Sequence, residues 1–180
     1  MGTYELVPHP ANPPLAVSAV QARILGLDAH WLTLRWRVEG ASLLTVPPFA
    51  GKGRADGLWQ ATCFELFVRP DGGAGYAEFN LSPSQSWAAY DFIAYREGMA
   101  ERPVPRDPVC TPRRGQSVLI FDAAIPAAAL PPLPWTYGLS AVIEEEDGRK
   151  SYWAIAHPDD RPDFHSQTCF AARLAAPTAP

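Results

Sequence analysis

Residues 58–95 decide the fold of this chain, and they read LWQATCFELFVRPDGGAGYAEFNLSPSQSWAAYDFIAY. Segments 58–68 and 75–81 alternate between apolar and mixed side chains, and the turn-rich sequence RPDGGA separates them. A third segment, 86–95, has a helical periodicity as well, but its density of aromatic residues favours a strand. Alternation with a period of two across a glycine-rich link predicts antiparallel strands.

Each of the first two predicted strands has one smooth apolar face and one face that carries polar groups. Trp59 and Glu65 share a face of segment 58–68, and Glu78 lies on a face of segment 75–81 with a tyrosine and an asparagine. Core packing does not explain carboxylates beside aromatic rings in mid-strand, because burying an unpaired charge is costly. We therefore expect a ligand-binding face, made of Trp59, Glu65, Tyr76, Glu78, Asn80 and, from an earlier strand, Arg35.

The remaining strands are predicted from the same kind of alternation and from the 20 prolines, which interrupt long helices. They are 3–8, 15–25, 30–38, 42–46, 116–125, 135–145, 149–156 and 169–174, with loops over 49–57, 96–115 and 157–168. About 9 to 11 short strands predict an all-β, antiparallel, jelly-roll-like β-sandwich. We expect its core to contain Trp36, Phe64, Leu66, Phe79, Leu81, Leu119, Phe121 and Val142.

Length and composition limit the function classes. The chain of 180 residues suits a single domain over 1–175, followed by an Ala/Pro tail over 176–180 that we expect to be disordered. A net charge of −4 gives no basic surface for nucleic acid, and no apolar run approaches the roughly 20 residues that span a bilayer. The sequence has no phosphate loop, GxGxxG or HExxH motif, so we expect no catalytic activity.

The N-terminal residues and the three cysteines bear on the compartment. The first 14 residues lack a basic region followed by an apolar one, as a secretory signal requires, although a protein whose signal had been removed would look the same. Cys63, Cys110 and Cys169 are far apart and lack CxxC spacing, which argues against a zinc site or a disulfide framework. We expect a cytoplasmic protein with free thiols.

Several strings of this sequence resemble the family 9 carbohydrate-binding modules and the wider DOMON-like superfamily. They are Leu58-Trp59, Phe64 to Phe67, Tyr76 to Asn80, Trp87 to Tyr90, Tyr152 to Ala154, Pro162 to His165 and Cys169-Phe170. The resemblance covers about residues 15–175 and implies a β-sandwich that binds a sugar or haem.

The resemblance also implies roles for particular residues. In the sugar-binding module, a tryptophan six residues before a strand glutamate stacks on a sugar ring, and the glutamate binds the hydroxyls. Trp59 and Glu65 have this spacing. A second aromatic side chain comes from a late segment, for which Trp153, Phe164 and His165 are the candidates, and Trp87 completes the set. The sequence therefore predicts a small polar ligand of the saccharide class and no obligatory cofactor.

Alternative interpretations remain open at this stage. Glu65 and Glu78 would also suit an ion-pair network with Arg35 and Arg37 across neighbouring strands, or the two carboxylates of a glycosidase. The sandwich face would suit a protein partner or a second copy of the chain. The resemblance includes haem-binding domains with Met and His ligands, for which Met99 and His165 are candidates. The loop with His157, Asp159, Asp160 and Asp163 would suit calcium.

Overall fold

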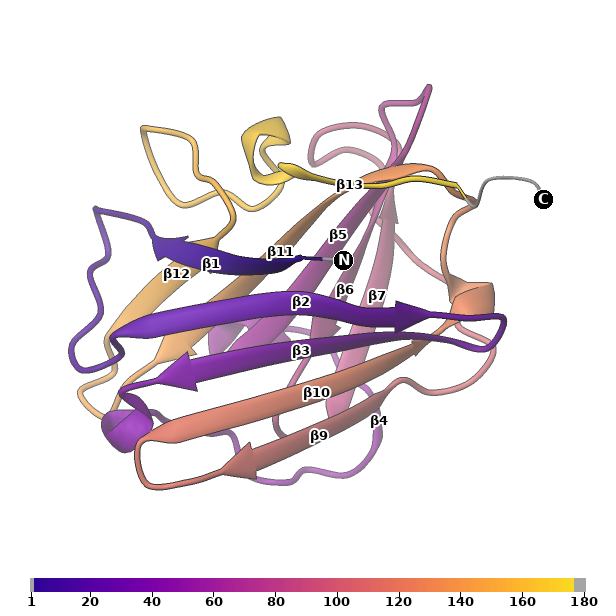
Figure 1. The fold of residues 1–180 in the computed structure, drawn as a ribbon. Helices are drawn as coiled ribbons and strands as arrows, with labels where there is room; N and C mark the ends of the chain where they lie inside the picture. Colours follow the sequence, from indigo (N-terminus) through magenta and orange to yellow (C-terminus); the bar gives the residue numbers. More distant parts are fainter. Residues whose placement is uncertain (1, 177–180) are drawn as a thin grey trace.

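The computed structural model describes residues 2–176, which form two β-sheets packed face to face (Figure 1). The expected disorder of the tail after residue 176 lies outside the described residues. The first sheet has the order β1 (Thr3–Pro8), β2 (Ala19–Leu27), β3 (Trp31–Glu39), β10 (Val118–Pro126) and β9 (Val109–Arg114). The second has the order β4 (Gly53–Arg54), β7 (Ser86–Phe92), β6 (Tyr76–Leu81), β5 (Cys63–Pro70), β11 (Trp135–Glu144) and β12 (Lys150–Ala154).

The two sheets are joined because β1 pairs with a strand of each. Its residues Thr3 to Leu6 pair with β2, and Val7 and Pro8 pair with β12. Two short strands extend the second sheet, β8 (Ala100–Glu101) beside β7 and β13 (Ala172–Leu174) beside β11. All pairings are antiparallel except that of β4 with β7.

Four short 3₁₀ helices lie between the strands. They are η1 (Ala41–Leu43), η2 (Leu58–Gln60), η3 (Ala127–Ala129) and η4 (Gln167–Cys169). Across residues 2–176, no helix is long and apolar enough to cross a membrane.

The predicted all-β sandwich is confirmed, and most predicted strands lie within a few residues of the observed ones. The predicted strand 42–46 is wrong, since its first residues belong to η1. The predicted loop 96–115 contains β8 and β9, and β4 lies within the loop 49–57. Strand β9 was missed because it is a proline-containing edge strand with mostly exposed side chains, and such strands lack the alternation of a half-buried one.

The main core lies between the sheets and is built around three aromatic rings. Trp36 and Phe121 from the first sheet meet Phe64 from the second, and the centroids of Phe64 and Phe121 are 4.5 Å apart in a stacked arrangement. All three side chains are fully buried. All predicted core residues except Val142 belong to this cluster. Val142 pairs with Cys63, the neighbour of Phe64, and paired residues point to the same face, so Val142 lies on the opposite face of the second sheet from Phe64.

A buried carboxylate fixes the segment that leads into β2. Glu145 is 1% exposed, and its side chain accepts backbone hydrogen bonds from Leu15, Ala16 and Val17 at 2.6, 2.6 and 3.0 Å. Hydrogen bonds to a charged acceptor are stronger than neutral ones, and three of them compensate for the removal of the carboxylate from water. Glu145 thus attaches the N-terminal segment to the end of β11.

We expect Glu145→Ala to lower the free energy of unfolding by about 2–4 kcal/mol, because three buried amide groups lose their acceptor. Denaturant unfolding followed by tryptophan fluorescence measures the change. The neighbouring Glu146 is exposed, so Glu146→Ala serves as the control and should change stability by less than about 0.5 kcal/mol. Equal stabilities of the two variants would contradict the assigned role of Glu145.

Candidate functional site

The outer face of the second sheet, which points away from the first sheet, forms the floor of a cavity of about 930 Å³. This volume lies at the upper end of the range that is typical of small-molecule sites. The floor consists of Glu65, Phe67, Glu78, Asn80, Tyr90, Phe92, Val142 and Tyr152. The walls come from three loops, through Asp56, Gly57 and Trp59, through Arg96 and Met99 to Glu101, and through Arg161 to His165, with Asn12 at one side.

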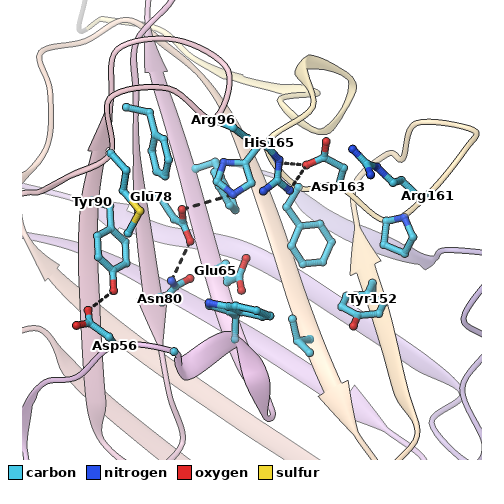
Figure 2. A pocket seen from close by; sticks show the side chains of 18 of the residues that line it. Asp56, Glu65, Glu78, Asn80, Tyr90, Arg96, Tyr152, Arg161, Asp163 and His165 are labelled. Atoms are coloured by element: carbon cyan, nitrogen blue, oxygen red, sulfur yellow. Dashed lines mark hydrogen bonds and ion pairs between the residues drawn. The ribbon is translucent and has the colours of Figure 1, made fainter.

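Five of the predicted binding residues line this cavity: Trp59, Glu65, Glu78, Asn80 and His165. Trp59 lies in η2 and not on the strand where the alternation placed it, and it is 53% exposed at the rim. Figure 2 shows Glu65, Glu78, Asn80 and His165 converging on one side of the sheet.

Tyr76 supports the site from the side. It lies on the outer face of β6 with its ring stacked on Phe92 at a centroid distance of 4.8 Å, and its hydroxyl lies 2.7 Å from Nδ1 of His165. It does not itself line the cavity. Tyr76 therefore orients His165 and stands behind the surface that a ligand would touch.

Three predicted site residues lie elsewhere. Arg35 is on β3 in the first sheet, where it forms a bidentate ion pair with Asp122 with nitrogen–oxygen distances of 2.6 and 2.9 Å. Trp87 and Trp153 belong to the core between the sheets. The prediction that they line the site is wrong. Successive side chains of a strand point to opposite faces, so Trp87 and Tyr90 point to opposite faces of β7, and Trp153 and Tyr152 point to opposite faces of β12. The tyrosines line the cavity, and the tryptophans therefore point into the core.

The predicted ion-pair network between the strand glutamates and Arg35 and Arg37 is also wrong. Arg35 pairs with Asp122, and Arg37 pairs with Glu39 at 3.0 Å. Both arginines belong to the first sheet, whereas Glu65 and Glu78 belong to the second. The two glutamates therefore need another explanation.

Several cavity residues were not identified from the sequence. Tyr90 and Tyr152 are on the floor, and Arg96 and Arg161 come from loops. The register of the hairpin between β6 and β7 would have revealed Tyr90, because it lies directly opposite Glu78. The sequence contains no comparable signal for the loop residues Arg96 and Arg161, because the alternation of a strand does not predict the position of a loop relative to the sheet.

The two floor carboxyl groups lie in a buried, acidic cluster. Glu65 is directly opposite Asn80 on the neighbouring strand, and Glu78 is two pairs further along, opposite Phe67. Burial raises the pKa of Glu65 well above its ordinary value, and the charge of Glu78 raises it further. Burial also raises the pKa of Glu78 to about 7, although the hydrogen bond from Asn80 and the charge of Arg96 act in the opposite direction.

Hydrogen bonding fixes the orientation of Asn80. Its Nδ2 donates to Oε1 of Glu78 at 2.8 Å, so its Oδ1 points the other way. That oxygen is buried and accepts no hydrogen bond from the described residues. Within residues 2–176 the Glu65 carboxyl, 3% exposed, likewise makes no hydrogen bond or ion pair. The floor thus presents acceptor atoms that the protein itself leaves unused.

His165 is held as a neutral imidazole. The Tyr76 hydroxyl accepts a hydrogen bond from the backbone N–H of Arg96 at 3.1 Å and lies 2.7 Å from Nδ1 of His165. Nε2 of His165 faces Oε2 of Glu78 at 3.7 Å. Burial and the nearby Arg96 lower the pKa of His165 to about 4, so this contact is not an ion pair near neutral pH.

The loop walls are tied together by Asp163. Its carboxylate accepts from Arg96 at 2.7 Å, from the backbone of His165 at 3.1 Å and from the Tyr95 hydroxyl. Burial alone would raise the pKa of Asp163, but these hydrogen bonds outweigh it and leave the pKa lowered. An ionised Asp163 therefore connects the loop after β7 to the loop after β12 over one end of the cavity (Figure 2).

Metal ligands do not cluster here. Within residues 2–176, no three His, Cys, Asp or Glu side chains come together in a way that would hold a metal ion. Met99 and His165, the haem candidates, both line the cavity, but Nδ1 of His165 is engaged by Tyr76 and Nε2 faces Glu78.

Comparison with solved structures identifies related folds. A presumed carbohydrate-binding protein from Bacteroides uniformis superimposes with a TM-score of 0.68 at 18% identity, covering 93% of this chain and 83% of that one. A family 9 carbohydrate-binding module from Caldicellulosiruptor kristjanssonii, in complex with cellotriose, superimposes with a TM-score of 0.52 at 9% identity, covering 87% of this chain and 74% of that one. The chain has a CBM9-like fold. No protein-family model and no curated protein matches the sequence.

The raised pKa of Glu78 predicts a pH-dependent stability difference between the protein and Glu78→Gln. A carboxyl group whose pKa is raised on folding stabilises the fold below its unfolded pKa, 4.5, and this contribution is lost as the pH rises through about 7. We therefore expect the free energy of unfolding of Glu78→Gln to rise by roughly 3 kcal/mol relative to that of the unaltered protein between pH 4.5 and pH 8.

Urea unfolding across this pH range measures the difference. The comparison of two proteins is needed because His165, whose pKa is lowered, gives a contribution of opposite sign that is lost as the pH falls from 6.5 towards about 4. A stability difference that does not change with pH would show that Glu78 titrates normally in the folded protein.

Proposed function

We propose that this protein binds a saccharide in the cavity over the second sheet and does not transform it. The observation that carries the proposal is the combination, in one cavity of about 930 Å³, of aromatic rings with buried carboxyl and amide groups on rigid strands. Trp59, Tyr90 and Tyr152 supply the rings, and Glu65, Glu78 and Asn80 supply the polar groups.

This combination matches the chemistry of a sugar. The C–H faces of a pyranose ring pack on aromatic surfaces, whereas its hydroxyl groups need hydrogen-bonding partners around the ring edge. Trp59 at the exposed rim offers a surface for stacking, and the floor beneath it offers acceptors. The affinity of such a site is modest, because hydroxyl hydrogen bonds to the protein replace hydrogen bonds to water.

The structural neighbours support this proposal. One is a presumed carbohydrate-binding protein, and the other is a carbohydrate-binding module with cellotriose bound. Both cover most of this chain, so the likeness concerns the whole sandwich and not one motif.

The electrostatics of the floor argue for binding without hydrolysis. A glycosidase separates the roles of its two carboxyl groups, with one ionised and one protonated near the working pH. Here burial raises the pKa of both Glu65 and Glu78, and among the described residues neither forms an ion pair with a charged cation that would hold it ionised as a nucleophile. The geometry therefore favours a binding site over a paired-carboxylate hydrolase.

A glycan array followed by calorimetry on the best ligand tests the proposal. We expect Trp59→Ala to lower the affinity for that ligand by about tenfold or more, because the exposed indole supplies the stacking surface. Phe49→Ala is the matched control, since Phe49 is 64% exposed but lies outside the cavity, and it should leave the affinity unchanged. The proposal fails if no sugar binds at millimolar concentration, or if turnover of a glycoside depends on Glu65 and Glu78.

A further inference from the structure

We propose that the saccharide carries a protonated amine, which docks between the Glu65 carboxylate and Oδ1 of Asn80. This inference rests on the proposed function and narrows its ligand class to amino sugars.

Once Glu65 and Glu78 are ionised, the acceptors at the centre of the floor outnumber the donors. One N–H of Asn80 Nδ2 donates to Glu78, and Oδ1 of Asn80 is buried without a partner among the described residues. The two oxygens of Glu65 are unused among the described residues, and Oε2 of Glu78 lies 3.7 Å from the nearest nitrogen of His165, beyond hydrogen-bonding distance. An ammonium group has three donors and no acceptor, so it matches this set better than a hydroxyl does.

Charge points the same way. Buried carboxylates in proteins are normally paired with a cation, because isolated burial of a charge is costly. Glu65 and Glu78 are 3% and 6% exposed, and both lack an arginine, lysine or charged histidine within ion-pair distance among residues 2–176. A ligand cation would supply the missing charge.

The cationic side chains of the cavity are engaged elsewhere or lie at its edge. Arg96 pairs with Asp163 at 2.7 Å, and the pKa of His165 is lowered to about 4, which leaves it neutral. Arg161 is exposed, and Figure 2 shows it beyond Asp163, away from Glu65. The other titratable side chains facing the cavity are acids or phenols: Asp56, Tyr90, Glu101, Tyr152 and Asp163.

The placement suits a sugar substituent. The acceptors lie on the strands β5 and β6, which are buried, whereas Trp59 is at the exposed rim. A pyranose ring stacked at the rim would direct one substituent down to Glu65 and Asn80 and leave its remaining hydroxyls to the loops. An amine at that substituent gains the charge-assisted hydrogen bonds, and an acetylated amine does not, because it is uncharged and keeps only one of the three N–H donors.

Calorimetry with matched pairs of sugars tests the inference. The panel contains glucose, galactose and mannose, their 2-amino forms and the corresponding N-acetyl forms, all at pH 7. We expect at least one amino sugar to bind about tenfold or more tightly than its parent hexose, and its N-acetyl form to lose that gain. Glu65→Gln should abolish the preference for the amino form over its parent hexose. Glu97→Gln removes an equal charge from an exposed position outside the cavity and should keep the preference.

Proton release provides a second measurement that needs no variant. Docking of an ammonium group favours the ionised carboxyls, whose pKa values are raised in the empty site, so binding releases protons near neutral pH. The binding enthalpy of the amino sugar then depends on the ionisation enthalpy of the buffer, and its affinity rises from pH 5 to pH 7. The parent hexose shows neither effect.

The outcomes separate the two proposals. Hexoses that bind as tightly as their amino forms, or amino sugars that bind without proton release, overturn the inference and leave the proposed function intact. A preference that survives in Glu65→Gln overturns the assignment of the amine to Glu65. If no saccharide on the array or in the panel binds, the proposed function itself is wrong and the inference falls with it.

Discussion

The register between β5 and β6 is the constraint on which the site depends. Both strands are buried along almost their whole length on both faces. In the observed register Phe64, Leu66 and Phe79 face the core, and Glu65 and Glu78 face the cavity. A slip of one strand by a single residue would exchange its two faces and drive carboxylates between the sheets, at a large cost in desolvation.

Burial of the outer face distinguishes this sheet from an ordinary antiparallel sheet, whose second face is solvated. Loops close over it, and a second cluster of aromatic rings forms there. Phe67, Tyr76 and Phe92 pack around His165, and Phe170 packs on Phe67 and Tyr76. This shell excludes water from the glutamates and so raises their pKa values. The electrostatic character of the floor is therefore a product of loops far from β5 in the sequence.

The sequence predicted much of this arrangement and missed a definable part. Alternation in segments 58–68 and 75–81 correctly placed Glu65, Glu78 and Asn80 on one face, because the period of a strand is a local property. It did not place Arg35, since alternation does not say which sheet a strand joins. Trp87 and Trp153 were placed in the site by the family resemblance, but the alternation of their own strands directs both side chains into the core. The loop residues Arg96 and Arg161 depend on tertiary contacts that no local pattern encodes.

The strand that joins the two sheets has a consequence for biosynthesis. Strand β1 is translated before the other strands, yet it is completed by β12, one of the last to emerge. At roughly 5–20 residues per second, the interval between their appearance is on the order of ten seconds. Throughout that interval Val7 and Pro8 of β1 lack their β12 partners, so the pairing through β1 that joins the two sheets cannot be completed until nearly the whole chain has emerged.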